Sequence, residues 1–346
     1  MKLSDYNYEL PKELIAQSAA EPRDSSRLML VNRGTNEVTH HIFSDLLEHL
    51  QEGDVMVFNN SRVIHARLRG HRSSGGAIEL LLLKNISSGI WEALVRPGRR
   101  MKSNTKFTVV SPDGQRQVNG TIKSVQHNGS RIVELEDDSR LDEIGILPLP
   151  PYIQADLTDS ERYQTIYAVN EGSIAAPTAG LHFTTDLMGK IRDHGVETVF
   201  VTLHVGWDSF RPIKNNDLAS HEMHSEFFHI SKSAAERITL AKSQNRRVIS
   251  VGTTAVRLLE HLGTQCQYSD SSPVLHEMSG HTNLFINPGF QFKLVDALIT
   301  NFHLPQSTLL MLTSAMAGSA LLRKSYEIAV DQKYRFYSFG DAMFII

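Results

Sequence analysis

A ten-residue stretch, AAPTAGLHFT (residues 175–184), combines conformationally special residues with one side chain capable of chemistry. Small residues surround Pro177 and Gly180, and His182 follows directly. Small side chains permit close approach of the backbone to a ligand, and histidine is the side chain best suited to proton transfer near neutral pH. For His182 alone, catalysis and a structural hydrogen bond explain the pattern equally well. We interpret the stretch as a ligand-cradling loop that enters a helix, with Thr184 as its N-cap.

Two further segments place polar residues where a predicted strand ends. VTLHVGWDSFRP (residues 201–212) puts His204 at the end of a strand-like run. VGTTAVR (residues 251–257) puts Thr253 and Thr254 between a strand and a helix. Backbone N–H groups at the start of a helix suit an anion such as a carboxylate or a phosphate. Taken alone, VGTT is explained more simply by a threonine N-cap.

The segment HEMHSE brings His221, His224 and Glu226 within six residues. Residues three apart share one face of a helix, so a metal site is conceivable there. The spacing differs from the HExxH motif of zinc proteases, and a solvated pair of histidines is the simpler explanation. We therefore predict no bound metal.

The composition is that of an ordinary globular protein: 346 residues, 41% hydrophobic and 21% charged. No apolar run approaches the roughly 20 residues of a membrane helix, and MKLSDYNYEL lacks the apolar region of a secretory signal. The single cysteine, Cys266, excludes an internal disulfide and a four-cysteine zinc site. We expect a cytoplasmic protein with no membrane partner. The net charge of −3 excludes a general polyanion binder, so a nucleic-acid surface would have to be a local patch.

Helical and strand-like patterns alternate after residue 155, which predicts an α/β fold with a largely parallel sheet and flanking helices. Capping and periodicity predict helices at 11–18, 44–53 and 160–168, and a hairpin over 25–43. Ligands of such folds bind where the strand ends meet loops and helix N-termini.

Between residues 67 and 147 the pattern changes to short alternating segments separated by turn residues, which is typical of a small antiparallel barrel. We predict a large α/β domain, residues 1–66 and 148–346, carrying an inserted β-barrel-like domain at 67–147. The entry strand and the insert hold a strong excess of cations. Between Asn60 and Lys106 there are ten basic residues and only two acidic ones, Glu79 and Glu92, which gives this stretch a local charge of about +8. A run of charge usually indicates only a solvated face. RNA docking through phosphates would use such a patch, and the candidate residues are Arg67, Arg69, Arg96, Arg99, Arg100 and Lys102.

Several long motifs resemble the S-adenosylmethionine:tRNA ribosyltransferase-isomerase family of queuosine biosynthesis, nearly end to end. They include YELPKELIAQ, FNNSRVIHARL, LPLPPYI, AAPTAGLHFT, VTLHVG, VISVGTTAVRLLE, DALITNFHLPQSTLLML and YRFYSFGDAMFI. The resemblance implies an α/β domain with an inserted β-barrel-like domain. It also implies an enzyme that transfers and isomerises the ribosyl moiety of S-adenosylmethionine onto 7-aminomethyl-7-deazaguanine at the tRNA wobble position. The products would be epoxyqueuosine in tRNA, adenine and methionine, with no cofactor beyond the consumed S-adenosylmethionine. We expect a monomer.

This chemistry requires general acids and bases and groups that bind the two substrates. The candidate catalytic residues are His182, His204 and His303, with Glu226 and Asp341 as carboxylate alternatives. The candidate substrate-binding residues are Asn60, Arg62, Thr178, Gly180, Phe183, Phe210, Thr253, Thr254 and Arg257. The sequence does not assign which group is acid and which is base.

The chain departs from the family pattern after HVG, where Trp207 and Asp208 stand in place of a small residue and a glycine. Asn287 replaces a tyrosine, and His65 replaces a proline before ARL. Two other functions stay open at this point: a non-catalytic tRNA-binding paralogue with an altered HVG loop, and a metal-dependent hydrolase based on HEMHSE.

Overall fold

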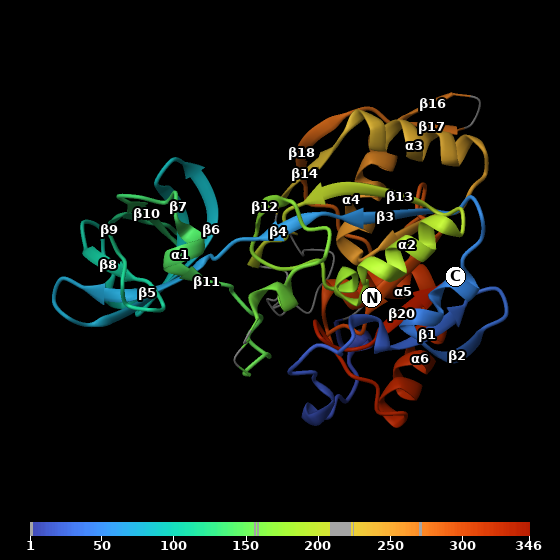
Figure 1. The fold of residues 1–346 in the computed structure, drawn as a ribbon, viewed down its shortest axis with the longest axis horizontal. Helices are drawn as coiled ribbons and strands as arrows, with labels where there is room; N and C mark the ends of the chain where they lie inside the picture. Colours follow the sequence, from blue (N-terminus) through green and yellow to red (C-terminus); the bar gives the residue numbers. More distant parts are fainter. Residues whose placement is uncertain (1–2, 156, 158, 208–222, 224, 270–271) are drawn as a thin grey trace. The chain divides into compact units, whose positions relative to one another are not determined.

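A nine-stranded mixed sheet forms the centre of the larger of two units in this computed structural model, which describes residues 3–155, 157, 159–207, 223, 225–269 and 272–346 (Figure 1). Its strands, in spatial order, are β18 (Met278–Thr282), β14 (Glu226–Ile230), β13 (Glu197–Leu203), β3 (Val55–Asn59), β15 (Val248–Val251), β19 (Ala297–Asn301), β20 (Ala342–Ile345), β1 (Arg27–Asn32) and β2 (Glu37–Ile42). β13, β3, β15 and β19 run parallel to one another, and β1 runs parallel to β20. The other pairs are antiparallel. The α/β class is confirmed, but the expected parallel order holds only for the central strands.

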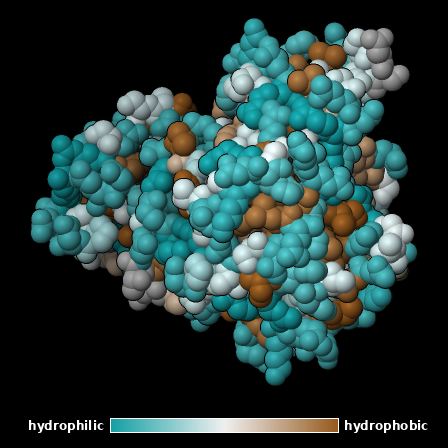
Figure 2. All heavy atoms as spheres, turned by 45° about the vertical axis from the view of Figure 1, so that its right-hand side comes forward, coloured by the Kyte–Doolittle hydropathy of each residue, from teal (hydrophilic) through white to brown (hydrophobic). Residues whose placement is uncertain are grey.

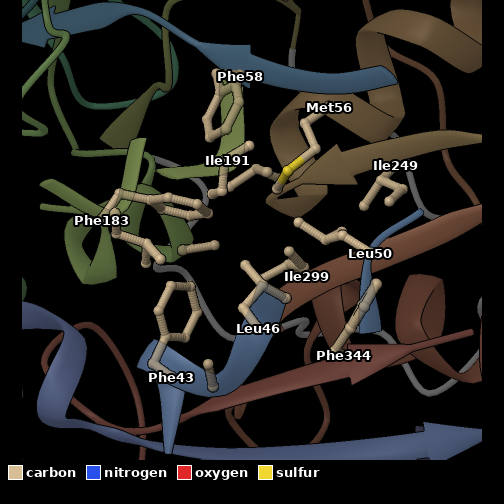
Figure 3. Close-up of a cluster of buried hydrophobic side chains, with 14 of the residues drawn as sticks. Phe43, Leu46, Leu50, Met56, Phe58, Phe183, Ile191, Ile249, Ile299 and Phe344 are labelled. Carbon is tan, nitrogen blue, oxygen red and sulfur yellow. The ribbon is translucent and has the colours of Figure 1, made fainter. Parts of the chain in front are cut away.

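The central strands are apolar because both of their faces are covered. Every residue of β3, β15 and β19 is buried. On one face, Met56 and Phe58 of β3 share a hydrophobic cluster with Phe183 and with Phe344 of β20, and Figure 3 shows these side chains pointing toward one another. A 3-10 segment, η4 (Phe43–His49), and the helix α2 (Thr185–Asp193) close this cluster.

Three helices of this unit begin at residues whose side chains cap them. Thr184 Oγ1 accepts the Leu187 N–H at 3.1 Å, which confirms the predicted N-cap of α2. Ser231 and Ser307 cap their helices in the same way. The remaining helices are α3 (Lys232–Ser243), α4 (Thr253–Gln265), α5 (Thr308–Ala317) and α6 (Ser319–Asp331).

Three expected helices are instead short 3-10 segments. Within residues 11–18 only η2 (Lys12–Leu14) is helical. The range 44–53 overlaps η4, and the range 160–168 contains η6 (Ser160–Tyr163). Segments this short gain little from α-helical propensity, and their i→i+3 bonds let them follow the surface on which they pack. The other 3-10 segments are η1 (Leu3–Tyr6), η3 (Arg23–Ser25), η5 (Gly98–Arg100) and η7 (Thr178–His182).

The predicted hairpin over 25–43 is confirmed as β1 and β2, paired from Arg27↔Ile42 to Asn32↔Glu37. There are also two small two-stranded ribbons: β4 (Ser61–Val63) with β12 (Asn170–Ser173), and β16 (Gln267–Ser269) with β17 (Ser272–Val274).

The smaller unit is a closed six-stranded antiparallel barrel. Its strands in order are β5 (Arg67–Arg72), β6 (Ala77–Ser87), β7 (Ile90–Arg96), β10 (Arg131–Leu135), β9 (Gln117–Val125) and β8 (Lys106–Val110). Pairing of β8 with β5 closes it, and α1 (Leu141–Ile144) and β11 (Gly145–Ile146) follow. Gly70 makes the closure possible, because a Cβ there would lie 1.9 Å from the Thr108 carbonyl oxygen. The larger unit comprises Met1–Arg62, Pro151–Asn170 and Ala176–Ile346, and the smaller Val63–Pro150 and Glu171–Ala175.

The surface of the face shown in Figure 2 is mostly hydrophilic, with hydrophobic residues in small groups. Within the described part of the chain, no helix is both long enough and apolar enough to cross a bilayer.

Candidate active site at the carboxyl edge of the central strands

The carboxyl ends of β13, β3, β15 and β19 meet at one edge of the sheet because these strands are parallel. In open α/β sheets this is the edge at which ligands bind. Two groups of polar side chains gather here. One lies around Asn59 and His204, and the other around Asn301 and His182.

Asn59, the last residue of β3, holds the first group together. Its Oδ1 accepts the Ser61 and Leu203 N–H groups at 3.1 and 3.0 Å. Its Nδ2 donates to the Leu203 carbonyl at 2.9 Å and to Thr254 Oγ1 at 3.3 Å. The side chain is fully buried, so this one amide fixes the ends of two strands and the start of α4 relative to one another.

His204 follows β13 and is the half-buried histidine of the site. Its Nδ1 lies 2.8 Å from Ser61 Oγ, and its ring stacks on Phe227 with centroids 5.6 Å apart. Its Nε2 forms no hydrogen bond with any described residue. Burial lowers the pKa of His204 below its usual 6.5, so the imidazole is neutral at neutral pH. A neutral histidine anchored through one nitrogen has the form required of a general base.

Glu226, the first residue of β14, forms a buried ion pair with Arg257 of α4. Its other oxygen accepts the Gly206 N–H at 2.9 Å. Both carboxylate oxygens are therefore engaged, which suits Glu226 to fixing the loop after His204 and not to moving a proton. Arg257 Nε donates to the Leu284 carbonyl at 3.1 Å, whereas its Nη2 is buried and has no hydrogen-bond partner among the described residues.

The N-terminus of α4 lies between the two groups. Gly252 precedes it at φ 92°, a conformation that favours glycine, and its N–H donates to the Ile299 carbonyl at 2.8 Å. Thr253 is buried as the first helical residue, and neither threonine of VGTT serves as a side-chain N-cap. The simple N-cap explanation of VGTT is therefore wrong. A Cβ on Gly252 would lie 3.7 Å from Ala179 Cβ, so the AAPTAGLHFT segment packs directly beside this helix start.

Asn301, the last residue of β19, holds the second group together. Thr178 Oγ1 donates to its Oδ1 at 3.0 Å, and its Nδ2 donates to the Tyr337 carbonyl at 3.2 Å and to His182 Nε2 at 3.1 Å. Because a carbonyl can only accept, the orientation of this amide is fixed. His182 Nε2 is therefore an acceptor, and the ring proton sits on Nδ1, 2.7 Å from Ser26 Oγ.

His182 is fully enclosed by this network and by Phe43, on which its ring stacks at 4.9 Å. Burial, with smaller contributions from Arg335 and Arg23, lowers the pKa of His182 to about 3. Both ring nitrogens are occupied and the ring stays neutral. Of the two interpretations of His182, catalysis and a structural hydrogen bond, this geometry favours the hydrogen bond, which orients Asn301.

The small residues of AAPTAGLHFT accommodate other side chains of the protein. A Cβ on Gly180 would lie 2.0 Å from Tyr167 Oη. Phe183 lies in the core, with its ring 5.0 Å from that of Phe43, and presents no face to a ligand. In this structure the segment is a packed turn, η7, that carries Thr178 to the strand edge, and not an open ligand cradle.

His303 and Asp341 lie beyond the strand edge, and both side chains are buried. Thr300 Oγ1 lies 2.8 Å from His303 Nε2, and burial lowers the pKa of His303 to about 3. Asp341 accepts the N–H groups of Arg27 and Arg335 at 3.0 and 2.8 Å, and burial raises its pKa. Asp341 thereby closes the turn between Tyr334 and β20.

Asn60 and Arg62 point away from the first group. Asn60 Oδ1 accepts the Thr202 hydroxyl at 2.8 Å, and Arg62 forms an ion pair with Glu161 at 2.5 Å. Asn60 and Arg62 are the two residues of FNNSR that were predicted to bind substrate, whereas Asn59 and Ser61 reach the strand edge. The sequence patterns also did not single out Asn301 and Ser26, although Asn301 stands within the motif DALITNFHLPQSTLLML.

A cavity of about 990 Å³ lies apart from this edge, between residues 4–9 and the helices α5 and α6. None of the predicted site residues lines it. Tyr8 and Tyr326, which do line it, bind the carbonyl and the N–H of His303 at 2.5 and 2.9 Å.

The predicted tRNA-binding residues lie on the barrel. Arg67 is half-buried and donates to the Leu149 carbonyl at 3.3 Å, and Arg69 lies 3.6 Å from Glu79. The others are exposed: Arg96, Arg99, Arg100 and Lys102.

Some predictions fall on residues outside those described, namely Asp208, Phe210, His221 and His224. No group of three His, Cys, Asp or Glu side chains among the described residues is arranged to hold a metal ion.

The sequence profile of queuosine biosynthesis proteins matches residues 3–345. The chain belongs to the queuosine biosynthesis protein family. Its queuosine-family relatives include proteins named S-adenosylmethionine:tRNA ribosyltransferase-isomerase. One from Desulfitobacterium hafniense is 50% identical and one from Thermoanaerobacter sp. (strain X514) is 49% identical, each over 351 residues and the full length of both chains. The crystal structure of an S-adenosylmethionine tRNA ribosyltransferase from Thermotoga maritima is 37% identical, with a TM-score of 0.57, and covers 99% of this chain and 100% of that one. The family expected from the motifs is confirmed.

Proposed function

We propose that this chain is an S-adenosylmethionine:tRNA ribosyltransferase-isomerase of queuosine biosynthesis. The observation that carries the proposal is identity of about half of all residues, over the full length, to relatives that bear this name. The enzyme transfers and isomerises the ribosyl moiety of S-adenosylmethionine onto 7-aminomethyl-7-deazaguanine at the wobble position of tRNA. Epoxyqueuosine-tRNA, adenine and methionine are the products. It acts as a cytoplasmic monomer and needs no cofactor besides the S-adenosylmethionine that it consumes.

The strand edge supports this chemistry with groups in suitable protonation states. A proton must leave the 5′ carbon beside the sulfonium, which requires a base that is unprotonated at the working pH. We assign this role to His204, because its burial favours the neutral ring and Ser61 holds its Nδ1. With the Nδ1 proton donated to Ser61, Nε2 has the lone pair that accepts the proton.

The buried Nη2 of Arg257 supports a substrate contact at the same edge. A buried donor without a partner costs about 1–3 kcal/mol, which binding of an acceptor would recover. The carboxylate of the methionine moiety, or a phosphate, supplies such an acceptor beside the N-terminus of α4.

The deciding experiment mixes purified protein, S-adenosylmethionine and tRNA that carries the aminomethyl-deazaguanine base, without added metal. Stoichiometric release of adenine and methionine with a matching mass gain of the tRNA supports the proposal. tRNA binding by folded protein without adenine release would favour a non-catalytic paralogue. Release that disappears with a chelator would favour a metal-dependent enzyme.

A further inference from the structure

The segment RPGRRMK, residues 96–102, is the most cationic part of the barrel, and we call it the basic loop. Its four cationic side chains, Arg96, Arg99, Arg100 and Lys102, are all exposed. The ion pairs described for the barrel join other residues, such as Arg116 with Glu143 and Lys123 with Glu134. The four charges of the basic loop are therefore uncompensated by the described part of the chain.

Arg131 of β10 lies beneath the loop and is 9% exposed. Its Nη2 donates to the Gly98 carbonyl at 2.7 Å and its Nε to the Met101 carbonyl at 3.1 Å. Its Nη1 donates to the Gly129 carbonyl. One planar guanidinium thus joins both ends of η5 to the turn before β10, and the fully buried Met101 side chain anchors the loop a second time.

The charge of Arg131 is buried with carbonyl oxygens as its partners and takes part in none of the ion pairs among the described residues. Burying a cation without a counter-ion is costly. Four exposed cations directly above it add like charge. An arrangement of this kind is stabilised by an external polyanion, and phosphate groups match the fork of a guanidinium.

We propose that the basic loop is a preformed docking site for the phosphate backbone of tRNA, and that Arg131 is the positioning residue that holds it in its docking conformation. The proposal rests on the proposed function for the identity of the RNA. Phosphate contacts fix the register of a protein on a nucleic acid and carry no sequence information. A loop that is already ordered loses less conformational entropy on binding than a mobile one.

The first test compares two double variants with the same loss of charge. Arg99→Gln/Arg100→Gln removes two loop cations, and Arg116→Gln/Lys123→Gln removes two paired cations elsewhere on the barrel. The dissociation constant for full-length tRNA is measured between roughly 50 and 200 mM KCl. The loop variant should bind at least about tenfold more weakly at low salt, with a salt slope reduced by about 2, one for each lost phosphate contact. The paired-charge variant should keep the wild-type slope. Equal behaviour of the two variants would overturn the docking site.

The second test addresses Arg131 by Arg131→Gln, with thermal unfolding as the check on folding. A positioning role predicts a KM for tRNA raised about tenfold, an unchanged KM for S-adenosylmethionine, and an unchanged kcat of adenine release. A folded variant with wild-type KM for tRNA would show that Arg131 is only structural. If Arg131→Gln does not fold, the loop variant still decides the docking site. Absence of adenine release by the wild-type protein would refute the proposed function, whereas an active wild type with unaffected loop variants would refute only the docking site.

Discussion

Replacing His182 by leucine separates an orienting role from a catalytic one. The substitution keeps the approximate volume but removes the partner of Ser26 Oγ and one partner of Asn301 Nδ2. A buried polar group left without its partner costs about 1–3 kcal/mol. With Asn301 Nδ2 still bound to the Tyr337 carbonyl, we expect His182→Leu to lower the free energy of unfolding at pH 7 by about 2–4 kcal/mol.

The same variant should also change the pH dependence of stability. The pKa of His182 is about 3 in the folded protein and near 6.5 when unfolded, so the unfolded chain binds the extra proton between these values. The stability contributed by the neutral ring is complete above pH 6.5 and is lost as the pH falls toward 3. The free energy of unfolding falls by up to about 1.4 kcal/mol for each pH unit in this range. His303 adds to the same fall, because its pKa is also lowered in the folded protein. In the His182→Leu variant, the free energy of unfolding should therefore depend less steeply on pH than in the wild type.

Urea unfolding at pH 7, 6 and 5 measures both effects, and Ser26→Ala provides the partner for a double-mutant cycle. The two substitutions should be coupled by about 0.5–3 kcal/mol. Adenine release at saturating substrate, measured below the unfolding transition, should fall less than about tenfold, since a general acid or base is worth about 10²–10⁴. Unchanged stability and slope with a loss of kcat above about a hundredfold would refute the orienting role and make His182 catalytic.

The remaining predictions concern the strand edge and the packed turn. His204→Ala should lower kcat for adenine release by about 10²–10⁴ with little change in stability, and the acid limb of the wild-type pH–rate profile should lie below pH 6.5, because burial lowers the pKa of His204. Glu226→Gln leaves the charge of buried Arg257 without its counter-ion, so the free energy of unfolding measured in urea should fall by about 3–5 kcal/mol. An unchanged free energy of unfolding would contradict the assignment of a structural ion pair. Gly180→Ala should destabilise the fold by displacing Tyr167, whereas Gly189→Ala, in a helix with open space around it, should raise stability by about 0.5–1 kcal/mol; melting temperatures that rank the two in the opposite order would contradict this packing.

Sequence patterns predicted elements whose stability comes from their own residues. The strand that ends before His204, the capped helix after Thr184 and the hairpin of β1 and β2 were predicted because apolar periodicity and caps are local signals. The short helical segments were not, because their 3-10 form depends on the surface against which they pack. The antiparallel course of β20 beside β19 likewise depends on pairing between distant parts of the chain.

The candidate site was predicted only in part for a similar reason. His204 and Thr254 stand at strand and helix ends, which the alternation of elements locates. The choice between Asn59 and Asn60 depends on which side chain of consecutive residues faces the strand edge, and a one-residue shift reverses it. For His182 the sequence left two roles open, and the observation that favours the orienting role is the amide orientation fixed by the Tyr337 carbonyl.

The position of β20 has a consequence for folding during synthesis. This strand, Ala342–Ile345, lies between β19 and β1, so the sheet cannot be completed until these residues have left the ribosome. The barrel, by contrast, is built almost entirely from Val63–Pro150 and can close while the ribosome still holds the rest. A nascent chain would carry a folded barrel and an incomplete sheet with unpaired strand edges, and such edges are prone to aggregation. Because the Tyr337 carbonyl orients Asn301 and lies just before β20, the second polar group can form only after this strand region has emerged. A chain that lacks residues 335–346 should lack both a complete sheet and an oriented Asn301.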